Sequence, residues 1–348
     1  MRYLDIDTRK RISKIGLGTW QFGAEEWGYG ADYSERVAPA IVRRAVELGI
    51  TLFDTAEIYA AGRSERILGR ALGAERESIF LGSKIFPVIP GGPLLNLRAK
   101  ASAGRLGTSR LDLYQVHFPN PIGDDRAIMN RMRSLQHSGL IDEVGVSNYS
   151  VQRWCAAERA LGGKILSNQV SYSLVDRGPE NDLLPFALQS GRIIIAFSPL
   201  AHGLLSGRYH KRNPPSDKVR AASVHFQPET FAQTEKLLEV LREVAAAHTA
   251  TPAQIALAWA IRHPAVVAIP GASSVEQLES NAAAAEIDLA ADEDQALRAA
   301  LPWPSEPTPQ RPGLRRKLAM ARHCAHGGKY LAKTLWRDFR YGTDTSTA

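Results

Sequence analysis

The sequence contains few cysteines and no long apolar run. Two cysteines in 348 residues, Cys155 and Cys324, give no disulfide framework and favour a reducing compartment. No stretch approaches the roughly 18 consecutive apolar residues that a membrane-spanning helix needs. The first ten residues are polar and do not resemble a signal peptide. We therefore expect a cytoplasmic protein without a transmembrane segment.

Common nucleotide-binding and hydrolase motifs are also missing. The sequence has no G-x-G-x-x-G after a predicted strand and no G-x-x-x-x-G-K-[ST], which argues against Rossmann and P-loop nucleotide sites. Residues 271–275 read GASSV and lack the final glycine of the G-x-S-x-G nucleophile elbow. The glycine cluster at 23–30 has none of these spacings and indicates a loop.

Positive charge is concentrated at the C-terminal end. The net charge is +7, and residues from Leu301 onward supply +6 of it, through nine Lys or Arg against three acids. The rest of the chain is nearly neutral, which argues against nucleic acid as a partner. Five prolines between 302 and 312 indicate an extended linker before a basic tail. The tail could be a lid, a subunit contact, an attachment to an acidic surface or membrane, or a solvated appendage.

Eight short β-rich runs recur along the chain, with helical patterns between them. Their near-continuous apolar residues are typical of parallel strands that are buried on both faces. The 44% hydrophobic content is sufficient for a large core. The predicted strands are 15–20, 51–56, 78–84, 112–118, 143–148, 166–173, 192–198 and 266–271.

The alternation of strands and helices predicts an α/β fold, a (β/α)8 TIM barrel, over residues 1–300. We expect Gly49 to end one helix and Ser64 to cap the next. Residues 2–15 are expected to form an N-terminal β-hairpin at the barrel floor, and residues 301–348 a Pro-rich linker and basic tail. The predicted helices named here are 38–49, 64–73, 235–248 and 252–263.

Four residues with chemically useful side chains lie at predicted strand ends. Asp54, Lys84 and His117 end the second, third and fourth strands, and Tyr59 lies in the loop after Asp54. In a (β/α)8 barrel the C-terminal ends of the strands carry the chemistry. Taken singly, an Asp there commonly caps a helix, a Lys is solvated, and a Tyr or His packs in the rim. Their joint placement on neighbouring strands favours one catalytic set.

A lysine beside a tyrosine can make the phenol a usable proton donor. The reference pKa of tyrosine is about 10, and an ammonium within ~4–6 Å lowers that pKa because it favours the phenolate. We expect Asp54 to pair with Lys84, and His117 to orient the substrate oxygen. Tyr59 would then protonate a carbonyl oxygen, a role typically worth about 10²–10⁴-fold. No residue in this set supplies a hydride, so a cofactor is required.

The four residues lie within a series of motifs that covers nearly all of the chain from residue 3 to about 300. They are GLGTWQFG (16–23), FDTAEIYAAGRSERILGRAL (53–72), SK (83–84), LDLYQVHFP (111–119), GVSNYS (145–150), NQVSYSL (168–174), FSPLAHGLLSGRY (197–209) and IPGASSVEQLESN (269–281). In these motifs and their order the chain resembles the aldo-keto reductase family, in style nearest its bacterial and potassium-channel β-subunit-like branches. The resemblance implies NADPH-dependent reduction of aldehydes or ketones to alcohols, with NADH use open.

The resemblance also implies an extended cofactor held by strand-end loops. Ser147, Asn148 and Gln169 would hold the nicotinamide carboxamide, and Phe197 would stack on the nicotinamide. A helix N-terminus near Ser273 would suit an anion. The other residues implied in cofactor binding are Asp54, Thr19 and Trp20 in the cleft, Ser198, Pro199, Leu200, Ala201, His202, Leu204 and Arg208 at the pyrophosphate, and Gly271, Gln277 and Asn281 at the adenosine. The simpler alternative is that these residues only cap helices and turn the chain.

Two positions depart from the family pattern. Residues 271–274 read GASS, where many members have Arg or Lys to neutralise the 2′-phosphate of NADPH. The channel-like branch also has Ser at the position of Ser273, so the resemblance still implies NADPH first. Asn120 stands where Asp is frequent after the catalytic histidine.

The implied substrate pocket is apolar and aromatic, which favours hydrophobic or aromatic carbonyl compounds over charged sugars. Besides Tyr59, its residues are Trp27, Tyr29, Ile85, Phe86 and Phe118.

Other functions are compatible with parts of the sequence. A redox-sensing subunit that holds NADPH and turns over slowly would suit the channel-like style and the basic tail. A metal-dependent hydrolase could use Asp54 and His117. The three residues His323, Cys324 and His326 lack a fourth ligand at a fitting spacing and are weak evidence for a metal, so we expect none. Assembly into homo-oligomers stays open.

Overall fold

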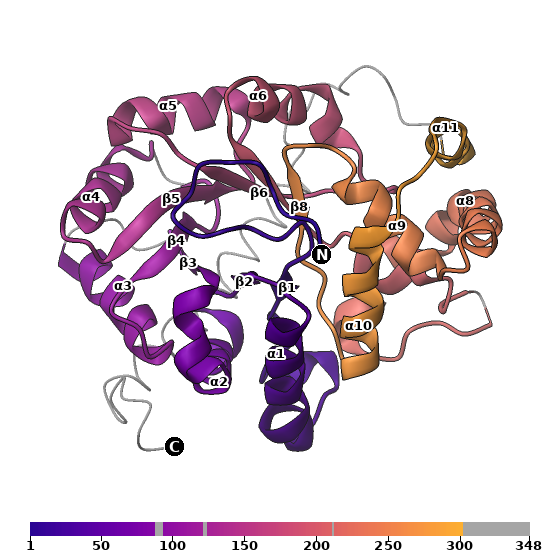
Figure 1. The fold of residues 1–348 in the computed structure, drawn as a ribbon, viewed down its shortest axis with the longest axis horizontal. Coiled ribbons are helices and arrows are strands. Elements are labelled where there is room, and N and C mark those ends of the chain that lie inside the picture. The colour runs from indigo at the N-terminus through magenta and orange to yellow at the C-terminus, as the bar shows by residue number, and fades with distance from the viewer. Residues whose placement is uncertain (88–92, 121–123, 211, 302–348) are drawn as a thin grey trace.

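The computed structural model describes residues 1–87, 93–120, 124–210 and 212–301, and the predicted linker and tail therefore lie outside the described residues except for Leu301. In the described chain, eight parallel strands follow one another in sequence order around the molecule (Figure 1). Each predicted strand is confirmed. The strands are β1 (Leu17–Gly18), β2 (Leu52–Asp54), β3 (Phe80–Ile85), β4 (Leu111–Val116), β5 (Ile141–Ser147), β6 (Ser167–Ser171), β7 (Ile193–Phe197) and β8 (Val266–Ala268).

The ring of strands closes between β8 and the residues that lead into β1. Ile15 and Ala268 form a parallel bridge, and the Gly16 amide donates to the Ala268 carbonyl at 2.7 Å. In return, the Ala268 amide donates to the Lys14 carbonyl at 2.9 Å. The predicted (β/α)8 barrel is thereby confirmed.

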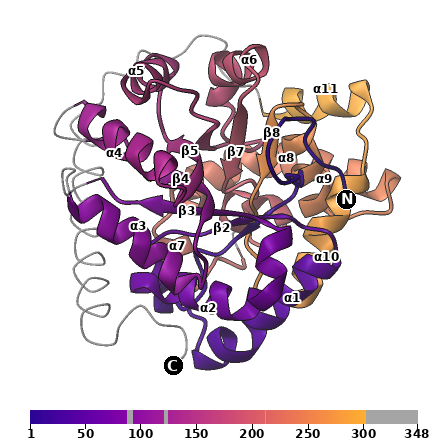
Figure 2. The same cartoon turned by 60° about the vertical axis from the view of Figure 1, so that its left-hand side comes forward.

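Helices surround the strands on the outside, as Figure 2 shows from a second direction. They cover the outer face of the strands because the amphipathic helices α1 and α2 place their apolar residues against the outward side chains of β1, β2 and β3. The helices are α1 (Ala38–Glu47), α2 (Arg63–Leu72), α3 (Pro93–Arg105), α4 (Arg126–His137), α5 (Val151–Leu161), α6 (Leu183–Gln189), α7 (Lys218–Ala221), α8 (Pro228–Ala247), α9 (Pro252–Ile261), α10 (Val275–Ala283) and α11 (Ala291–Ala300).

The N-terminal segment covers one end of the ring (Figure 1). Tyr3 and Ser13 form an antiparallel bridge, and the Leu4 amide donates to the Ile12 carbonyl at 2.8 Å, so residues 2–15 pair as the predicted hairpin. Ile12 is fully buried against side chains inside the barrel, among them Leu52 at the start of β2. This end is therefore the floor, and the C-terminal strand ends lie at the opposite end.

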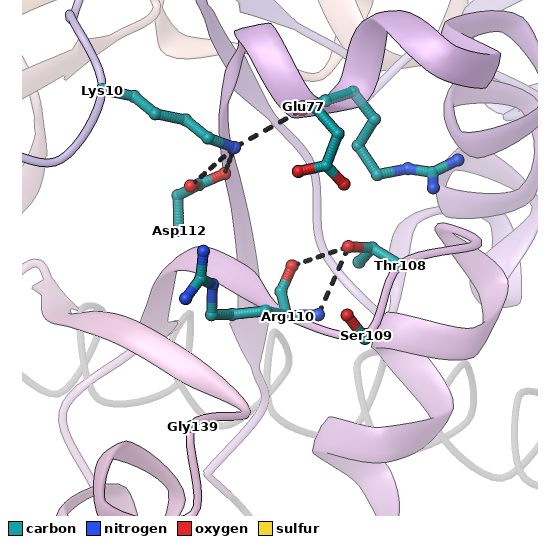
Figure 3. A pocket seen from close by; sticks show the side chains of 8 residues that line it. Lys10, Glu77, Thr108, Ser109, Arg110, Asp112 and Gly139 are labelled. Carbon is teal, nitrogen blue, oxygen red and sulfur yellow. Dashed lines mark hydrogen bonds and ion pairs between the residues drawn. The ribbon is translucent and has the colours of Figure 1, made fainter.

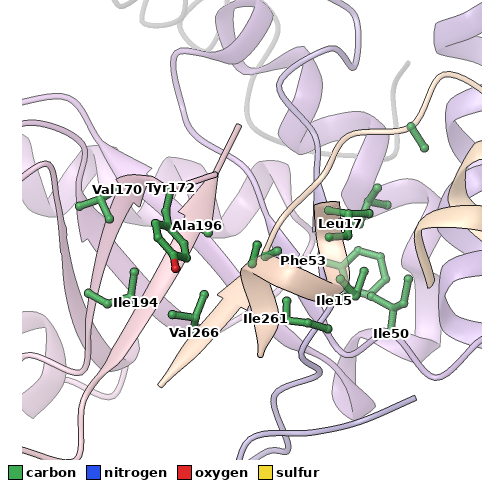
Figure 4. Packing of buried hydrophobic residues seen from close by; sticks show 14 of the residues in the cluster. Ile15, Leu17, Ile50, Phe53, Val170, Tyr172, Ile194, Ala196, Ile261 and Val266 are labelled. Carbon is green, nitrogen blue, oxygen red and sulfur yellow. The ribbon is translucent and has the colours of Figure 1, made fainter. Parts of the chain in front are cut away.

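The barrel has two apolar layers because strand side chains alternate in direction. Inward residues such as Leu52 and Phe80 fill the interior. Outward residues such as Phe53 and Ile194 pack against the helices in the larger layer, part of which Figure 4 shows. Polar side chains that point inward near the C-terminal strand ends are the exceptions to this apolar interior.

One helix boundary was predicted with the wrong cap. Helix α1 ends at Glu47, and Gly49 follows with φ of 76°, as expected for a helix stop. Helix α2, however, begins at Arg63, with Gly62 rather than Ser64 as its N-cap. Ser64 is buried and donates to the Thr19 carbonyl at 2.8 Å, because its side chain faces the strand ends instead of the helix terminus.

Candidate active site

The ion pair of Asp54 and Lys84 is set by the pairing of β2 with β3. Asp54 lies opposite Gly82 in the parallel register, and Lys84 is two residues further along, so it projects into the barrel on the same face. Lys84 Nζ lies 2.5 Å from Asp54 Oδ2, and both residues are buried. The same nitrogen donates to the Thr55 carbonyl at 2.8 Å.

Tyr59 reaches Lys84 from the chain segment that follows β2. It opens a short helical turn, η3 (Tyr59–Gly62), and its hydroxyl lies 3.2 Å from Lys84 Nζ. Directly after Tyr59 the chain passes through positive φ at Ala60 (47°) and Ala61 (53°), a conformation that is uncommon for non-glycine residues. Such local strain persists where the surrounding structure imposes it, and it concentrates at functional sites.

The environment keeps both groups protonated at neutral pH. Burial raises the pKa of Tyr59 above its usual value; the Lys84 charge opposes this rise and the Asp54 charge adds to it. Lys84 thus acts in the predicted direction, but the expectation of a lowered pKa for Tyr59 was wrong because burial outweighs the ammonium. For Lys84, burial lowers the pKa, but Asp54 and Tyr59 together raise it above its usual value. The pair is a charged ammonium beside a neutral phenol.

His117 follows β4 and lies beside the phenol. Its backbone amide donates to the Ile85 carbonyl at 2.9 Å, which continues the pairing of β3 and β4 beyond the strands. The His117 ring meets the Tyr59 ring edge-on, with centroids 5.6 Å apart, and stacks on Phe118 at 4.7 Å. The structure therefore brings all four predicted catalytic residues together at one end of the barrel.

Gln115 is a member of this cluster that the sequence reasoning missed. Its side-chain amide donates to Asp54 Oδ1 at 3.1 Å, and Gln169 donates to the same oxygen at 2.9 Å. The two amides hold the carboxylate so that Oδ2 faces Lys84. A signal was available: Gln115 is an uncharged polar residue in an apolar run, two residues before His117 and hence on the same strand face.

Polar residues assigned to the nicotinamide carboxamide lie together at the end of β5, directly after it, and on β6. Ser147 Oγ donates to the Gln169 carbonyl at 2.8 Å, and Asn148 Nδ2 donates to Ser147 Oγ at 2.9 Å. Asn148 has φ of 63°, which turns the chain at the end of β5. None of these side chains caps a helix, so the simpler alternative does not account for Ser147.

The loop after β7 turns sharply beside the cleft. Positive φ values occur at Ser198 (50°), Ala201 (48°) and His202 (57°). Ala201 and Leu204 are fully buried, so their side chains face the core and only their backbone is available to a ligand. The remaining residues assigned to this loop are Phe197, which is half-buried, Pro199, which is buried, Leu200, which is half-buried, and Arg208, which is exposed.

The residues assigned to the adenosine end surround the N-terminus of α10. Ser274 caps this helix, and the Ser273 amide and hydroxyl both donate to Gln277 Oε1, at 2.9 and 2.8 Å. Asn281 Nδ2 donates to the Gly271 carbonyl at 3.3 Å. These contacts hold the loop in place against the first turns of the helix.

Thr19 and Trp20 occupy different positions in the cleft. Thr19 is fully buried, and its hydroxyl donates to the Asp54 carbonyl at 3.0 Å. Trp20 is 38% exposed and meets Trp27 edge-on at 5.0 Å. Its ring centroid is 6.4 Å from that of Tyr59. Trp20 therefore contributes open aromatic surface next to the phenol.

Two of the residues assigned to the substrate pocket offer little surface in this structure. Ile85 and Phe86 are each 1% exposed. Ile85 is the neighbour of the inward-pointing Lys84, so it points outward into the layer under the helices. Trp27 is buried with its edge against Trp20, and Tyr29 stacks on Tyr33 at 4.5 Å.

A small polar pocket of about 160 Å³ lies at the floor rather than at this site (Figure 3). It is lined by Lys10 from the hairpin, by residues that precede β3, β4 and β5, and by Asp112 near the start of β4, with which Lys10 pairs. Floor positions of (β/α)8 barrels serve stability rather than chemistry. The full lining is Lys10, Arg76, Glu77, Thr108, Ser109, Arg110, Asp112 and Gly139.

A family comparison agrees with this arrangement of barrel and strand-end cluster. The sequence model described as the aldo/keto reductase family matches residues 14–302. The chain belongs to the aldo/keto reductase family. It is accordingly an NAD(P)H-dependent oxidoreductase that uses a nicotinamide cofactor and acts on small carbonyl compounds, which removes the hydrolase alternative.

Individual relatives extend over most of the chain. An uncharacterized oxidoreductase of Mycobacterium tuberculosis is 54% identical over 297 residues, which cover 85% of this chain and 92% of the relative. Methylglyoxal reductase YeaE of Escherichia coli is 35% identical over 299 residues, covering 85% and 94%. A crystal structure of an aldo/keto reductase from Klebsiella pneumoniae in complex with NADP and acetate is similar with a TM-score of 0.71 at 31% identity, covering 87% and 96%.

The described residues contain neither a candidate metal site nor a candidate membrane-spanning helix. No group of three or more His, Cys, Asp or Glu side chains in that part of the chain could hold a metal ion. His323, Cys324 and His326 lie outside it. Within the same residues, none of the helices combines the length and the apolar character needed to cross a membrane.

Proposed function

We propose that the protein reduces aldehydes or ketones to alcohols with NADPH and that Tyr59 is the proton donor. The contact that carries this proposal is Lys84 Nζ, which lies 2.5 Å from Asp54 and 3.2 Å from the Tyr59 hydroxyl at the C-terminal strand ends. A neutral phenol next to a fixed ammonium has the proton to give and a charge to stabilise the phenolate that remains.

Each residue of the cluster has a role in this reaction. Tyr59 donates its proton to the carbonyl oxygen, and Lys84 stabilises the phenolate as it forms. Asp54, held by two glutamine amides, keeps Lys84 charged and in place. His117, beside the phenol, orients the carbonyl oxygen. When bound, the reduced nicotinamide supplies the hydride that reaches the carbonyl carbon.

The strand-end residues of β5 to β8 suit an extended dinucleotide. Asn148 and Gln169 offer amide groups beside the catalytic cluster, and the N-terminus of α10 with Ser273 suits an anionic group. We propose NADPH as the main cofactor, in keeping with the NADP that the Klebsiella neighbour contains. Because 271–274 lack a basic side chain, we expect weaker selection against NADH than an arginine there would give.

We propose an uncharged, apolar or aromatic carbonyl compound as the substrate. Trp20 presents exposed aromatic surface next to Tyr59, and Phe118 stacks on His117 at the same end. Aromatic walls around a few polar groups are typical of sites for small apolar ligands. Methylglyoxal is included as a test compound because one relative is named for its reduction.

Steady-state oxidation of NADPH with a panel of aldehydes and ketones tests this function. We expect multiple turnovers at about 1 s⁻¹ or faster with at least one carbonyl compound. A single burst with NADP⁺ retained on the protein would instead favour the redox-sensing subunit. Absence of both NADPH binding and turnover over the whole panel would contradict the proposal.

A further inference from the structure

Two more buried ion pairs lie directly behind the catalytic cluster. Their acids, Glu57 and Glu65, come from the segment between β2 and the first turn of α2, and their bases, Arg98 and Arg105, come from α3. All four residues are at most 2% exposed. A buried ion pair must offset a large desolvation cost, so it is weak evidence for stability by itself. The role of each pair therefore depends on which segments it connects.

The Glu57–Arg98 pair binds the chain at the end of β3. Glu57 Oε1 accepts a hydrogen bond from the Phe86 amide at 2.7 Å, and Arg98 Nη2 donates to the Phe86 carbonyl at 2.7 Å. Arg98 Nε donates to Glu57 Oε2 at 3.0 Å. The Glu57 backbone amide also donates to the Lys84 carbonyl at 3.3 Å. Glu57 thus contacts the residues on both sides of Ile85.

This position couples the two halves of the proton-donating pair. Tyr59 is two residues after Glu57, on a turn of unusual backbone conformation, and Lys84 is two residues before Phe86. The reactive ends meet where Lys84 Nζ lies 3.2 Å from the Tyr59 hydroxyl and 4.8 Å from the centre of the Tyr59 ring. The fixed spacing of Glu57 and Phe86 limits how far the two segments can separate.

The Glu65–Arg105 pair has the same chemistry and burial but different contacts. Arg105 Nε donates to Glu65 Oε2 at 2.6 Å, and Ser83 Oγ donates to Glu65 Oε1 at 2.6 Å. Arg105 is seven residues after Arg98, two turns along the same face of α3. Glu65 lies in α2, six residues beyond Tyr59. The Arg105 side chain also packs against Gly62, the last residue of the Tyr59 turn, where a Cβ would lie 2.8 Å from Arg105 Cδ. It is the Glu57–Arg98 pair that binds both backbone groups of Phe86.

We propose that Glu57 and Arg98 are positioning residues, which hold the Tyr59 turn against the end of β3 so that the Tyr59 hydroxyl stays at hydrogen-bond distance from Lys84. This inference rests on the proposed carbonyl reduction. Without the pair, the phenol and the ammonium separate, and the phenolate that forms on proton transfer loses part of its stabilisation. The Glu65–Arg105 pair joins α2 to α3 and serves packing.

Kinetics of E57Q, with E65Q as the matched control, test the proposal. Both changes keep the shape of the side chain and remove one buried negative charge. We expect E57Q to lower kcat by about 10- to 100-fold, the size of effect that small misplacements cause, with KM for the carbonyl compound within about threefold. E65Q should retain kcat per folded molecule within about threefold. An equal loss of kcat in both variants would overturn the proposal, because it would indicate a general packing effect.

A titration independent of the cofactor gives a second readout. The absorbance of tyrosinate, measured against pH in each protein and in the same protein carrying Tyr59→Phe, isolates Tyr59 by difference. Because Lys84 lowers the pKa of Tyr59, separating the two groups should raise that pKa in E57Q and leave it unchanged in E65Q. An unchanged Tyr59 pKa in folded E57Q would contradict the proposal.

A double variant and the unmodified enzyme separate failure of the positioning role from misfolding and from failure of the proposed function. If E57Q does not fold, the double variant E57Q/R98M removes both charges of the pair and leaves no uncompensated one. We expect it to fold and to have the same kcat deficit as described for E57Q; full wild-type kcat would overturn the proposal. The unmodified enzyme is measured first: if it does not turn over, the proposed function has failed, whereas an active enzyme with an equally active E57Q refutes only the positioning role.

Discussion

Each end of the barrel contains a Lys–Asp ion pair, but the two lysines have different further partners. At the C-terminal end, Lys84 Nζ lies 2.5 Å from Asp54, 2.8 Å from the Thr55 carbonyl and 3.2 Å from the Tyr59 hydroxyl. At the floor, Lys10 Nζ lies 2.9 Å from Asp112 and donates to the Ile79 carbonyl at 2.8 Å (Figure 3).

The difference lies in the remaining partner of each ammonium. Lys10 makes its further contact, at 3.4 Å, with another backbone carbonyl, that of Arg76, and such an oxygen has no proton to transfer. Lys84 instead faces a phenol, whose proton can leave. In the proposed reaction, a Lys–Asp pair at a strand end assists proton transfer only where the ammonium also touches a group with a proton to give.

Removing the phenol hydroxyl should have the largest effect, because it takes away the partner that distinguishes Lys84 from Lys10. We expect Tyr59→Phe to lower kcat by about 10²–10⁴-fold, the usual value of a positioned acid, while the Kd for NADPH changes by less than about twofold. The ammonium and the cleft remain, so only proton transfer is lost. Steady-state kinetics and a fluorescence titration with NADPH measure the two effects.

The hairpin supplies a control tyrosine at the floor. Tyr3 donates its hydroxyl proton to the Gly49 carbonyl at 3.0 Å, far along the chain from the strand-end cluster. Tyr3→Phe should leave kcat within about twofold of the unmodified protein and cost about 1 kcal/mol of unfolding free energy. Retained reduction in Tyr59→Phe would show that another group donates the proton.

Exchanging each lysine for methionine compares the two pairs directly. Lys84→Met leaves Asp54 without its counter-charge, so we expect a loss of about 3–5 kcal/mol in unfolding free energy together with a kcat lower by about 100-fold or more. Lys10 is more exposed, so Lys10→Met should cost less stability, about 1–3 kcal/mol, with kcat unchanged. Denaturant unfolding and steady-state kinetics of both variants check this.

The kcat of Lys10→Met is the measurement that could refute the comparison. If Lys10→Met lowered kcat as strongly as Lys84→Met, the two lysines would not differ in function, and the role of the third partner would have to be abandoned.

The fold and the four central residues could be predicted because their signals are local or periodic. Each strand is a short apolar run, and Asp54, Lys84 and His117 are charged or polar residues at the ends of such runs. In parallel strands, neighbouring ends meet at one edge. Aligning these ends predicts the contacts of Lys84 with Asp54 and Tyr59, which the structure contains. It does not predict the raised pKa of Tyr59, because the balance between burial and charge depends on the final packing.

Contacts between side chains far apart in the sequence could not be predicted in the same way. Glu57 finds Arg98 41 residues away, and no periodicity links a glutamate in a loop to an arginine on a helix face. Ser64 has the composition of a cap, but it bonds to Thr19 because the start of α2 lies against the strand ends. Buried polar residues, which must find partners, are the positions where pattern and structure differ most.

Lowering the pH should change the stability of the two ends in opposite directions, by less than the substitutions above. Burial lowers the pKa of His202, beside the cleft, to about 4, and the charges of His225 and Arg220 add to this. At the floor, burial raises the pKa of Asp112, against the opposing effect of Lys10 and the Leu81 amide. Between about pH 6.5 and 4 the unfolded chain takes up a proton at His202 that the folded chain does not, so this end loses stability as pH falls. At Asp112 the pKa is higher in the folded chain, so the folded chain holds the extra proton and the floor gains stability as pH falls towards the usual aspartate value.

His202→Gln isolates the contribution of the cleft. Between pH 6.5 and 4 we expect the variant to lose about 1–3 kcal/mol less unfolding free energy than the unmodified protein, since glutamine does not titrate. Urea unfolding at several pH values measures the two slopes. Parallel slopes would mean that His202 has a similar proton affinity in the folded and the unfolded chain. The loss of stability in acid would then have to come from another group. The neighbouring His225, whose pKa is also lowered by burial, is one candidate.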